Sequence, residues 1–341
     1  MRNCLLAAAA LLISSAPACD ADAQSHRNAL VDLHAAKAAV FGLYAPANPR
    51  GRGGRGRGGA ATDPSRPTPP PPAQKTPAEL AKEAVAYTAS DYLFDGSMEG
   101  NFDAGYASFS EYMKGMAAAL PAADRLKFPF MVKTHEIAEN VPLAQERIAR
   151  QLNLGVAGIV FVGVESADEV KAGLAAMRFT SKGGVRPDDV GGAPAYWGMS
   201  DADYREKADL WPLNPKGELV NWTIVESKEG LAHVREIAAV KGIGVLFPGA
   251  GTLGGVFRKV DAAGQPVLDA NGRPQRDDVA WEAAIQQVLA ACKEFNVPCG
   301  FPANDPETMA MRYQQGFRVF VIGWGENGFR TVEAGKKLAG R

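Results

Sequence analysis

Polar residues of the kind used in catalysis follow several apolar runs of this 341-residue sequence. Glu226 comes directly after the run VNWTIV, and the cluster Lys133-Thr134-His135-Glu136 closes the run PFMV. A carboxylate that ends an apolar strand is costly to bury unless something pairs with it, which favours a functional role for Glu226. If the protein has an active site, we expect it at these strand ends, because parallel sheets gather their chemistry there.

A glycine-rich stretch follows the next apolar run. Residues 249–254 read Gly-Ala-Gly-Thr-Leu-Gly and match the pattern G-x-G-x-x-G. Dinucleotide binding would require a helix to begin within this stretch and an acidic residue to end the next strand. The sequence from Val256 onward instead predicts a hairpin. We therefore expect a loop whose glycines let a ligand oxyanion approach backbone N–H groups.

The segments that would position these residues alternate regularly between strand and helix patterns. Apolar residues recur at helical spacing in 228–240, between the strand patterns 220–225 and 243–247. The expected strands are 38–44, 91–95, 129–133, 156–162, 220–225, 243–247, 298–301 and 317–323. Eight strands, each followed by a helix, predict a (β/α)8 TIM barrel, with an open doubly wound sheet as the competitor. In a barrel the carboxyl ends of the strands share one face, where we expect the polar residues.

Four segments fall outside this alternation. Residues 1–23 carry a positive start, a short apolar run and small residues, which predicts a secretory signal and export; a lipoprotein with Cys19 lipidated is the alternative. Residues 46–75 are rich in Gly, Arg and Pro and predict a disordered insertion. Residues 180–216 are irregular, and 256–277 predict a hairpin insertion with turns at Ala263-Gly264 and Asn271-Gly272. The remainder, 24–341, is expected to form a single barrel domain.

The composition limits the classes of partner that the sequence predicts. The formal net charge of −1 gives no reason to expect nucleic acid or an anionic membrane, although an RGG-like run within 46–75 can in principle bind RNA. The N-terminal apolar run is too short to span a bilayer as a helix. Downstream of the expected signal the chain keeps Cys292 and Cys299, and the sequence leaves open whether they form a disulfide or stay as thiols.

Three stretches resemble one known family. Residues 155–179 (GVAGIVFVGVESADEVKAGLAAMRF), 224–254 and 305–329 look like the HpcH/HpaI aldolase/citrate lyase family, and VFGLY and DYLFDGSMEGNFD resemble its opening strands. The resemblance covers roughly 38–339. It implies a TIM barrel of the phosphoenolpyruvate/pyruvate-domain type, commonly a hexamer, so we expect a homo-oligomer. It also implies a divalent cation, Mg²⁺ or Mn²⁺, that chelates pyruvate or its enolate.

The resemblance assigns roles residue by residue. Glu226 takes the place of the family's first metal carboxylate, whereas its second falls on Thr252, a neutral hydroxyl. The family's substrate-binding Arg falls on Lys133, and Glu99 keeps the Glu of a motif whose catalytic His has no counterpart. The expected substrate contacts are Lys133, Gly251, Thr252 and Arg186, and the expected catalytic residues are Lys133, His135 and Glu99.

Two arrangements of the site stay open at this stage. Glu99, His135 and Glu226 could together hold a rearranged metal, or His135 and Glu136 could merely cap or solvate the following helix. The first hypothesis for function is a metal-dependent carbon–carbon lyase acting on a 2-keto acid or pyruvate-like carboxylate. The alternative is a catalytically altered or non-catalytic carboxylate-binding relative on the same barrel.

Overall fold

A computed structural model describes residues 26–48 and 73–341. The expected signal segment 1–23 lies outside the described residues, as do residues 49–72 of the expected insertion 46–75. Among the described helices, none is long and apolar enough to cross a membrane.

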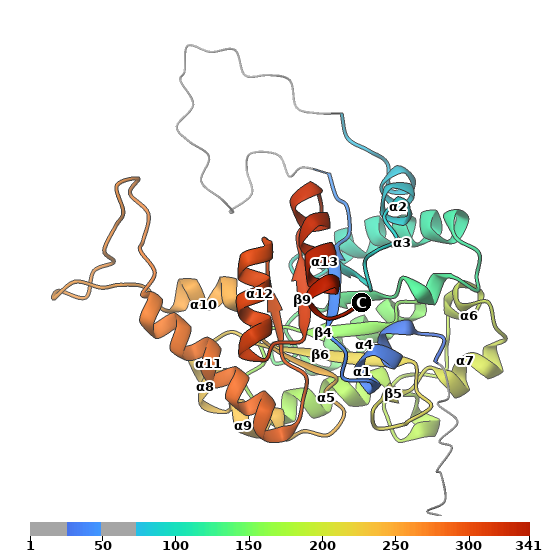
Figure 1. Ribbon diagram of the computed structural model, residues 1–341. Coiled ribbons are helices and arrows are strands. Elements are labelled where there is room, and N and C mark those ends of the chain that lie inside the picture. The colour runs from blue at the N-terminus through green and yellow to red at the C-terminus, as the bar shows by residue number, and fades with distance from the viewer. Residues whose placement is uncertain (1–25, 49–72) are drawn as a thin grey trace, which may run out of the picture.

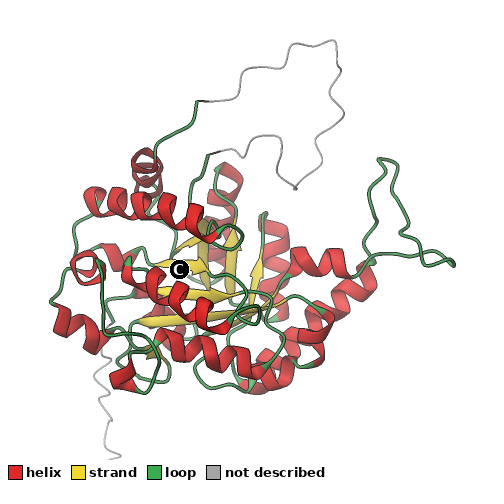
Figure 2. Cartoon of the chain, turned by 180° about the vertical axis from the view of Figure 1, so that it is seen from behind, coloured by secondary structure: helices red, strands yellow, loops and turns green. Residues whose placement is uncertain are grey.

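Eight parallel strands close into a barrel, surrounded by helices (Figures 1 and 2). They are β1 (Val40–Tyr44), β2 (Leu93–Asp95), β3 (Phe130–Lys133), β4 (Gly158–Phe161), β6 (Leu219–Val225), β7 (Val245–Pro248), β8 (Gly300–Pro302) and β9 (Val319–Ile322). Neighbouring strands pair in parallel from β1 to β4, β6 and β7, and β8 pairs with β9, which returns to β1. A parallel bridge from Leu246 to Cys299 closes β7 onto the start of β8. The predicted (β/α)8 barrel is confirmed, and the open sheet is wrong.

The helices form the outer layer and follow the strands in chain order. They are α2 (Pro77–Ala86), α3 (Phe102–Ala119), α4 (Val141–Asn153), α5 (Ala167–Met177), α8 (Lys228–Ala232), α9 (Val234–Ala238), α10 (Ala250–Val256), α11 (Asp278–Phe295), α12 (Pro306–Gln315) and α13 (Glu326–Leu338). α1 (Ala29–Ala35) precedes β1. Local sequence sets the helix starts: Thr76 and Glu79 form a capping box at the start of α2.

Two apolar layers hold the barrel together, one inside it and one between strands and helices. Along β6, Val220, Trp222 and Ile224 point inward, because side chains alternate across a strand. Trp222 fills the barrel centre, with its ring 4.8 Å from that of Tyr92 and 5.2 Å from that of Phe247. The interior is a packed core, so a ligand can bind only at the ends of the barrel.

The structure corrects three expectations about secondary structure. The segment 180–216 is not irregular: it holds α6 (Ala193–Trp197), α7 (Asp201–Lys207) and β5 (Leu210–Trp211), which pairs with β6. The helix expected over 228–240 is broken at His233, whose backbone is not helical and whose Nδ1 lies 3.0 Å from Glu165 O.

The glycine-rich stretch is the third correction. It forms the helix α10 instead of the expected loop, and the buried side chains of Ala250 and Leu253 anchor it to the barrel. The following strand β8 ends in Phe301 and Pro302, so the acidic residue that dinucleotide binding requires is missing from that strand end.

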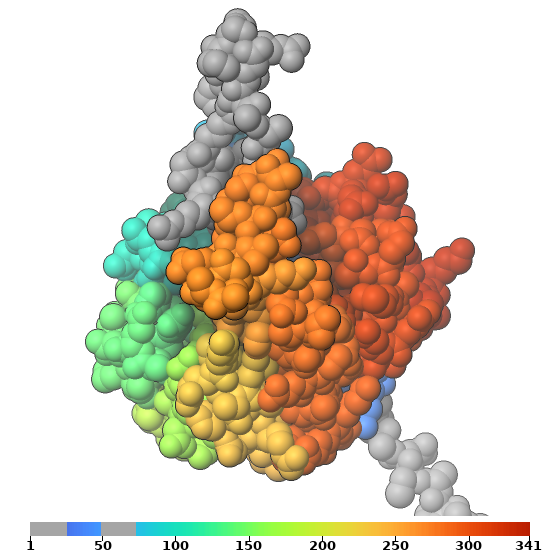
Figure 3. Space-filling model, turned by 90° about the vertical axis from the view of Figure 1, so that its left-hand side faces the viewer, coloured from blue at the N-terminus to red at the C-terminus, as the bar shows by residue number. Residues whose placement is uncertain are grey.

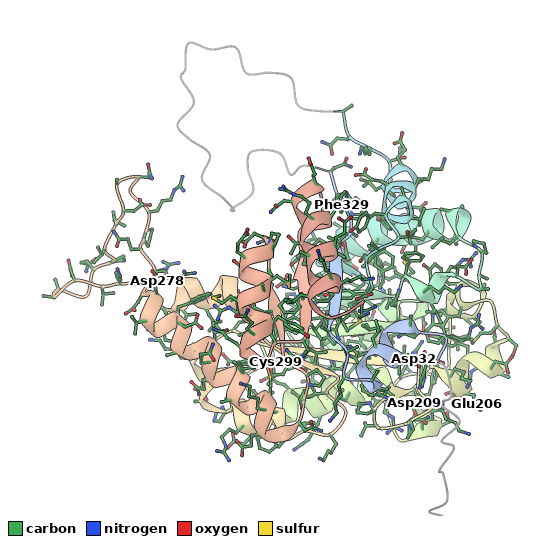
Figure 4. All side chains as sticks on the ribbon, in the orientation of Figure 1. Asp32, Glu206, Asp209, Asp278, Cys299 and Phe329 are labelled. Carbon is green, nitrogen blue, oxygen red and sulfur yellow. A yellow bond between two sulfur atoms is a disulfide. The ribbon has the colours of Figure 1, made fainter. Side chains whose placement is uncertain are left out.

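Between α10 and α11 the chain forms two short hairpins, with antiparallel bridges from Val260 to Pro266 and from Leu268 to Pro274. This double hairpin (residues 257–277) projects from the barrel in Figure 1 and rises from the surface in Figure 3. At the opposite, N-terminal end of the barrel, Cys292 and Cys299 form a disulfide with Cα atoms 5.6 Å apart, and Cys299 is labelled in Figure 4.

Candidate active site

A cavity of about 520 Å³ lies at the carboxyl ends of the strands, the face on which TIM barrels carry their active sites. The apolar part of its wall includes Phe94, Val160, Ile224, Phe247, Phe301 and Val321. The polar and charged lining residues include Lys133, Glu226, Thr252, Arg276 and Asn304. The cavity therefore offers an apolar surface with two cations and one carboxylate.

Glu226 directly follows β6, and its carboxylate is held in place by backbone. Its Oε1 accepts a hydrogen bond of 3.0 Å from the N–H of Gly163, which follows β4. Gly249 allows the approach from the other side, because a Cβ there would lie 2.3 Å from Glu226 Cβ and 2.6 Å from Oε2. Among the described residues Oε2 receives no hydrogen bond, so this oxygen is available to a ligand.

A second carboxylate, that of Glu136, lies close to Gly163. A Cβ on Gly163 would lie 2.9 Å from Glu136 Oε1, and the φ of +61° at Gly163 also favours glycine. Burial, together with the neighbouring carboxylates of Glu139 and Glu226, raises the pKa of Glu136 above its ordinary value. Glu136 is not among the residues that line the cavity.

Lys133 ends β3 and points its ammonium at Glu99. Its Nζ donates hydrogen bonds of 3.0 and 2.8 Å to the two carboxylate oxygens of Glu99, which lies in the loop after β2. The side chain of Lys133 is 16% exposed and that of Glu99 39%. Gln151 of α4 donates a hydrogen bond of 2.8 Å to the backbone O of Lys133 and fixes the strand end. The two predicted residues thus meet as an ion pair, with the lysine lining the cavity.

His135 lies just outside the cavity and braces the Glu99 loop. Its Nδ1 lies 2.8 Å from the backbone O of Glu99 and its Nε2 lies 2.6 Å from Glu139 Oε2. The hydrogen bond to the Glu99 backbone, helped by Glu139, raises the pKa of His135. Both ring nitrogens are therefore occupied by protein groups.

The expected metal triad of Glu99, His135 and Glu226 does not form. Glu99 is engaged by Lys133, and His135 is engaged by the Glu99 backbone and Glu139. Within 26–48 and 73–341, no three His, Cys, Asp or Glu side chains come together in a way that could hold a metal ion. The rearranged metal site is therefore wrong.

The inherited metal site also lacks part of its donor set. Glu226 lines the cavity as expected, and Thr252 faces it from α10, beside Gly251. A neutral hydroxyl is a poor substitute for a carboxylate as a ligand of Mg²⁺ or Mn²⁺. The residues that line this cavity, called the mouth cavity below, therefore do not fit a cation held by two protein carboxylates.

Arg186 lies away from the cavity. Its guanidinium is buried 4.3 Å from the centre of the Phe179 ring, and its Nη2 donates hydrogen bonds to Asn153 and to the hydroxyl of Tyr204. These contacts hold the segment 180–216, which follows α5, against α4. The structure does not bring Arg186 to the expected substrate.

Two polar lining residues, Arg276 and Asn304, were not identified from the sequence. Arg276 reaches the mouth from the base of the double hairpin, with its guanidinium 3.9 Å from the centre of the Trp281 ring and its Nε 2.7 Å from Asp278 Oδ1. Asp278 is labelled at the foot of this hairpin in Figure 4. Asn304 follows β8, so its position just past a strand end is a signal that could have identified it.

Comparison with known proteins gives distant but consistent relatives. No protein-family model matches the chain. A 2-dehydro-3,6-dideoxy-6-sulfogluconate aldolase of Pseudomonas putida is 26% identical over 191 residues, which are 54% of this chain and 63% of that protein. A hydroxypyruvate/pyruvate aldolase of Paraburkholderia phytofirmans is 24% identical over 250 residues, 72% of this chain and 82% of that protein.

The fold has solved counterparts. The crystal structure of an HpcH/HpaI aldolase/citrate lyase family protein from Burkholderia cenocepacia J2315 matches with a TM-score of 0.54 at 21% identity. The match covers 76% of this chain and 88% of that one. It supports the barrel architecture described above.

Proposed function

Because the chain is a divergent member of the HpcH/HpaI aldolase/citrate lyase family, we propose that it is a carbon–carbon lyase for a 2-keto acid, forming or cleaving an aldol bond. The observation that carries the proposal is the composition of the mouth cavity. It sets a cation, Lys133, and a carboxylate with an available oxygen, Glu226, against an apolar wall.

The described side chains suit the two ends of such a substrate. Lys133 offers a positive charge for the keto-acid group, and the apolar wall of Phe94, Val160 and Ile224 lowers the dielectric around it, which strengthens that attraction. Glu226 is positioned to take or return the hydroxyl proton as the carbon–carbon bond breaks or forms, a role that requires a base within hydrogen-bond reach.

The divalent cation implied by the family resemblance has one charged ligand among the cavity-lining residues, Glu226. When bound, such a cation would polarise the keto-acid oxygens as a Lewis acid. No step of the proposal depends on it, and the assay below is run with Mg²⁺, with Mn²⁺ and with a chelator. Export of the protein, with residues 1–23 as the signal segment, and a homo-oligomeric assembly also belong to this proposal.

The test is exchange of the methyl protons of pyruvate with solvent, followed by NMR on the purified protein. Pyruvate has no hydroxyl proton, so in this assay Glu226 is expected to act on a methyl proton, at the carbon from which the aldehyde would leave. We expect exchange by the wild type and a loss of about 10²- to 10⁴-fold in Glu226→Gln, the usual contribution of a catalytic base. Glu229→Gln, three residues further along in α8 and exposed, is the matched control and should exchange at the wild-type rate.

Two results would contradict the lyase. Wild-type protein that binds pyruvate without exchanging it under any of these conditions would support the carboxylate-binding alternative. Equal exchange in Glu226→Gln and Glu229→Gln would remove the mouth cavity from the reaction.

A further inference from the structure

We infer that Lys133 is the nucleophile of this lyase: its amine forms an imine with the carbonyl carbon of the 2-keto acid, and Glu99 moves the protons that this step requires. The inference rests on the proposed function, since it takes a 2-keto acid as substrate. It replaces the carboxylate-binding role that the family resemblance gives to Lys133.

The first argument is the environment of the amine. Lys133 ends β3 on the cavity wall, its side chain is 16% exposed, and the neighbouring lining residues Phe94 and Val160 are apolar. Its backbone is fixed by Gln151. A lysine nucleophile needs a fixed position at the wall of the binding cavity, and the strand end of β3 holds the amine there.

The second argument is the partner. Both oxygens of Glu99 lie within 3.0 Å of Lys133 Nζ, inside the range over which a carboxylate can accept a proton. The Glu99 side chain is 39% exposed, so it can exchange that proton with solvent. His135 contacts the Glu99 backbone and holds the loop in place. The base Glu99 therefore contacts both the nucleophile and a group that fixes its loop.

The third argument is the chemistry of the residue type. A guanidinium stays protonated and cannot attack a carbonyl, whereas the amine of a lysine can lose its proton and do so. The mouth also lacks the donor set for the cation that would otherwise draw electrons from the substrate, as Thr252 shows. An imine supplies the same electron withdrawal through a covalent bond.

The step balances without another reactant. Glu99 takes a proton from the ammonium, and the Nζ lone pair forms a bond to C2 of the keto acid while the carbonyl π electrons move to oxygen, which gains a proton from Glu99. Glu99, again a carboxylate, takes a second proton from the nitrogen and passes it to the new hydroxyl group. The carbon–oxygen bond then breaks, water leaves, and the nitrogen lone pair forms C=N. The net change converts ammonium and ketone into a protonated imine and water, with no oxidation or reduction.

The imine prepares the carbon–carbon cleavage. Its positive nitrogen accepts the electron pair of the breaking C3–C4 bond as an enamine, and Glu226 takes the hydroxyl proton of the departing aldehyde. The substrate carboxylate then needs another cation. Arg276 is available on the cavity lining, held by the Trp281 ring and Asp278.

Reductive trapping tests the inference. Full-length protein is incubated with pyruvate and borohydride, and intact mass and peptide mapping locate the adduct. We expect one reduced pyruvate per chain on Lys133, none on Lys133→Arg, and a full adduct on Lys293→Arg, whose lysine lines the cavity at the other end of the barrel. Lys133→Cys, which gains an amine after alkylation with bromoethylamine, should regain the adduct.

The outcomes separate this inference from the function on which it rests. Adduct formation and proton exchange that both survive chelation support both. Proton exchange without an adduct, abolished by a chelator, overturns the imine and leaves the lyase standing. The absence of both exchange and adduct overturns the lyase, and an adduct spread equally over other lysines overturns the role of Lys133.

Discussion

The two ends of the barrel carry cavities of similar size, about 520 Å³ at the carboxyl ends of the strands and about 550 Å³ at the amino ends. The two cavities differ in the groups to which their lysine and arginine side chains donate hydrogen bonds. At the amino end, Lys293 donates to the backbone O of Gln315, and Arg318 donates to the backbone O of Tyr313 and Phe317. At the carboxyl end, Lys133 donates to a carboxylate, that of Glu99.

The difference lies in what the partner can do. A backbone carbonyl accepts a hydrogen bond but cannot take the proton. Lys293 and Arg318 therefore stabilise the end of α12 and the turn after it, which is a structural role. A carboxylate can take the proton, so the pair of Lys133 and Glu99 is equipped for chemistry. Cavity size alone would not have separated a structural end from a reactive one.

The largest effect is expected from adding one methyl group at either end of β7. Gly249→Ala would place a Cβ 2.3 Å from Glu226 Cβ, and Gly244→Ala would place one 2.6 Å from Val220 Cγ1. Both should lower the free energy of unfolding by about 1–3 kcal/mol, as overpacking does. Only Gly249→Ala should also lower kcat/KM, by about 10²-fold, because it moves Glu226.

Urea unfolding and steady-state kinetics on the folded fraction measure the two effects. Equal losses of kcat/KM in Gly249→Ala and Gly244→Ala would erase the distinction between the ends.

A second effect, on stability alone, is expected from acid at the amino end. Burial lowers the pKa of His34 to about 4, so between that value and its ordinary value near 6.5 the unfolded chain binds a proton that the folded chain does not. Stability is therefore complete above pH 6.5 and falls as the pH drops, by on the order of 3 kcal/mol near pH 4.

Urea midpoints measured from pH 8 to pH 4 should fall less steeply for His34→Phe than for wild type. His233→Gln, at the break between α8 and α9, is the control and should follow the wild type. Parallel curves for wild type and His34→Phe would contradict a buried neutral imidazole at this end.

The smallest effect concerns the disulfide at the same end. Cys292 and Cys299 are seven positions apart, so their bond closes a short loop and should contribute about 2 kcal/mol to the free energy of unfolding. Cys292→Ala/Cys299→Ala should lose this amount and keep its kcat/KM, measured by urea unfolding and kinetics. A larger change in kcat/KM than in stability would show that the two ends are coupled.

The order of strands and helices could be predicted from sequence because each buried strand is a short apolar run set off by helical spacing. The strand ends then place Lys133, Glu226 and Thr252 on one face, as the structure shows. Two elements were not predicted from the sequence. The glycines of α10 have low helix propensity, and tertiary contacts support this helix instead. β5 is only two residues long.

The details of the site depend on loops that leave no periodic signal. The ion pair between Lys133 and Glu99 needs the turn after β2 to fold back across β3. Arg276 reaches the cavity only because the double hairpin returns to the barrel at Asp277, and Arg186 misses it because the excursion after α5 is packed on the outside.

The base of the double hairpin is closed by a backbone hydrogen bond of 2.9 Å from Asp277 N to Phe257 O, while its body stands clear of the barrel (Figures 1 and 2). Such a segment can be inserted, lengthened or lost in one genetic event without displacing α10 or α11. Since Arg276 enters the mouth from this segment, a lineage could change which acids the barrel accepts while inheriting its core unaltered.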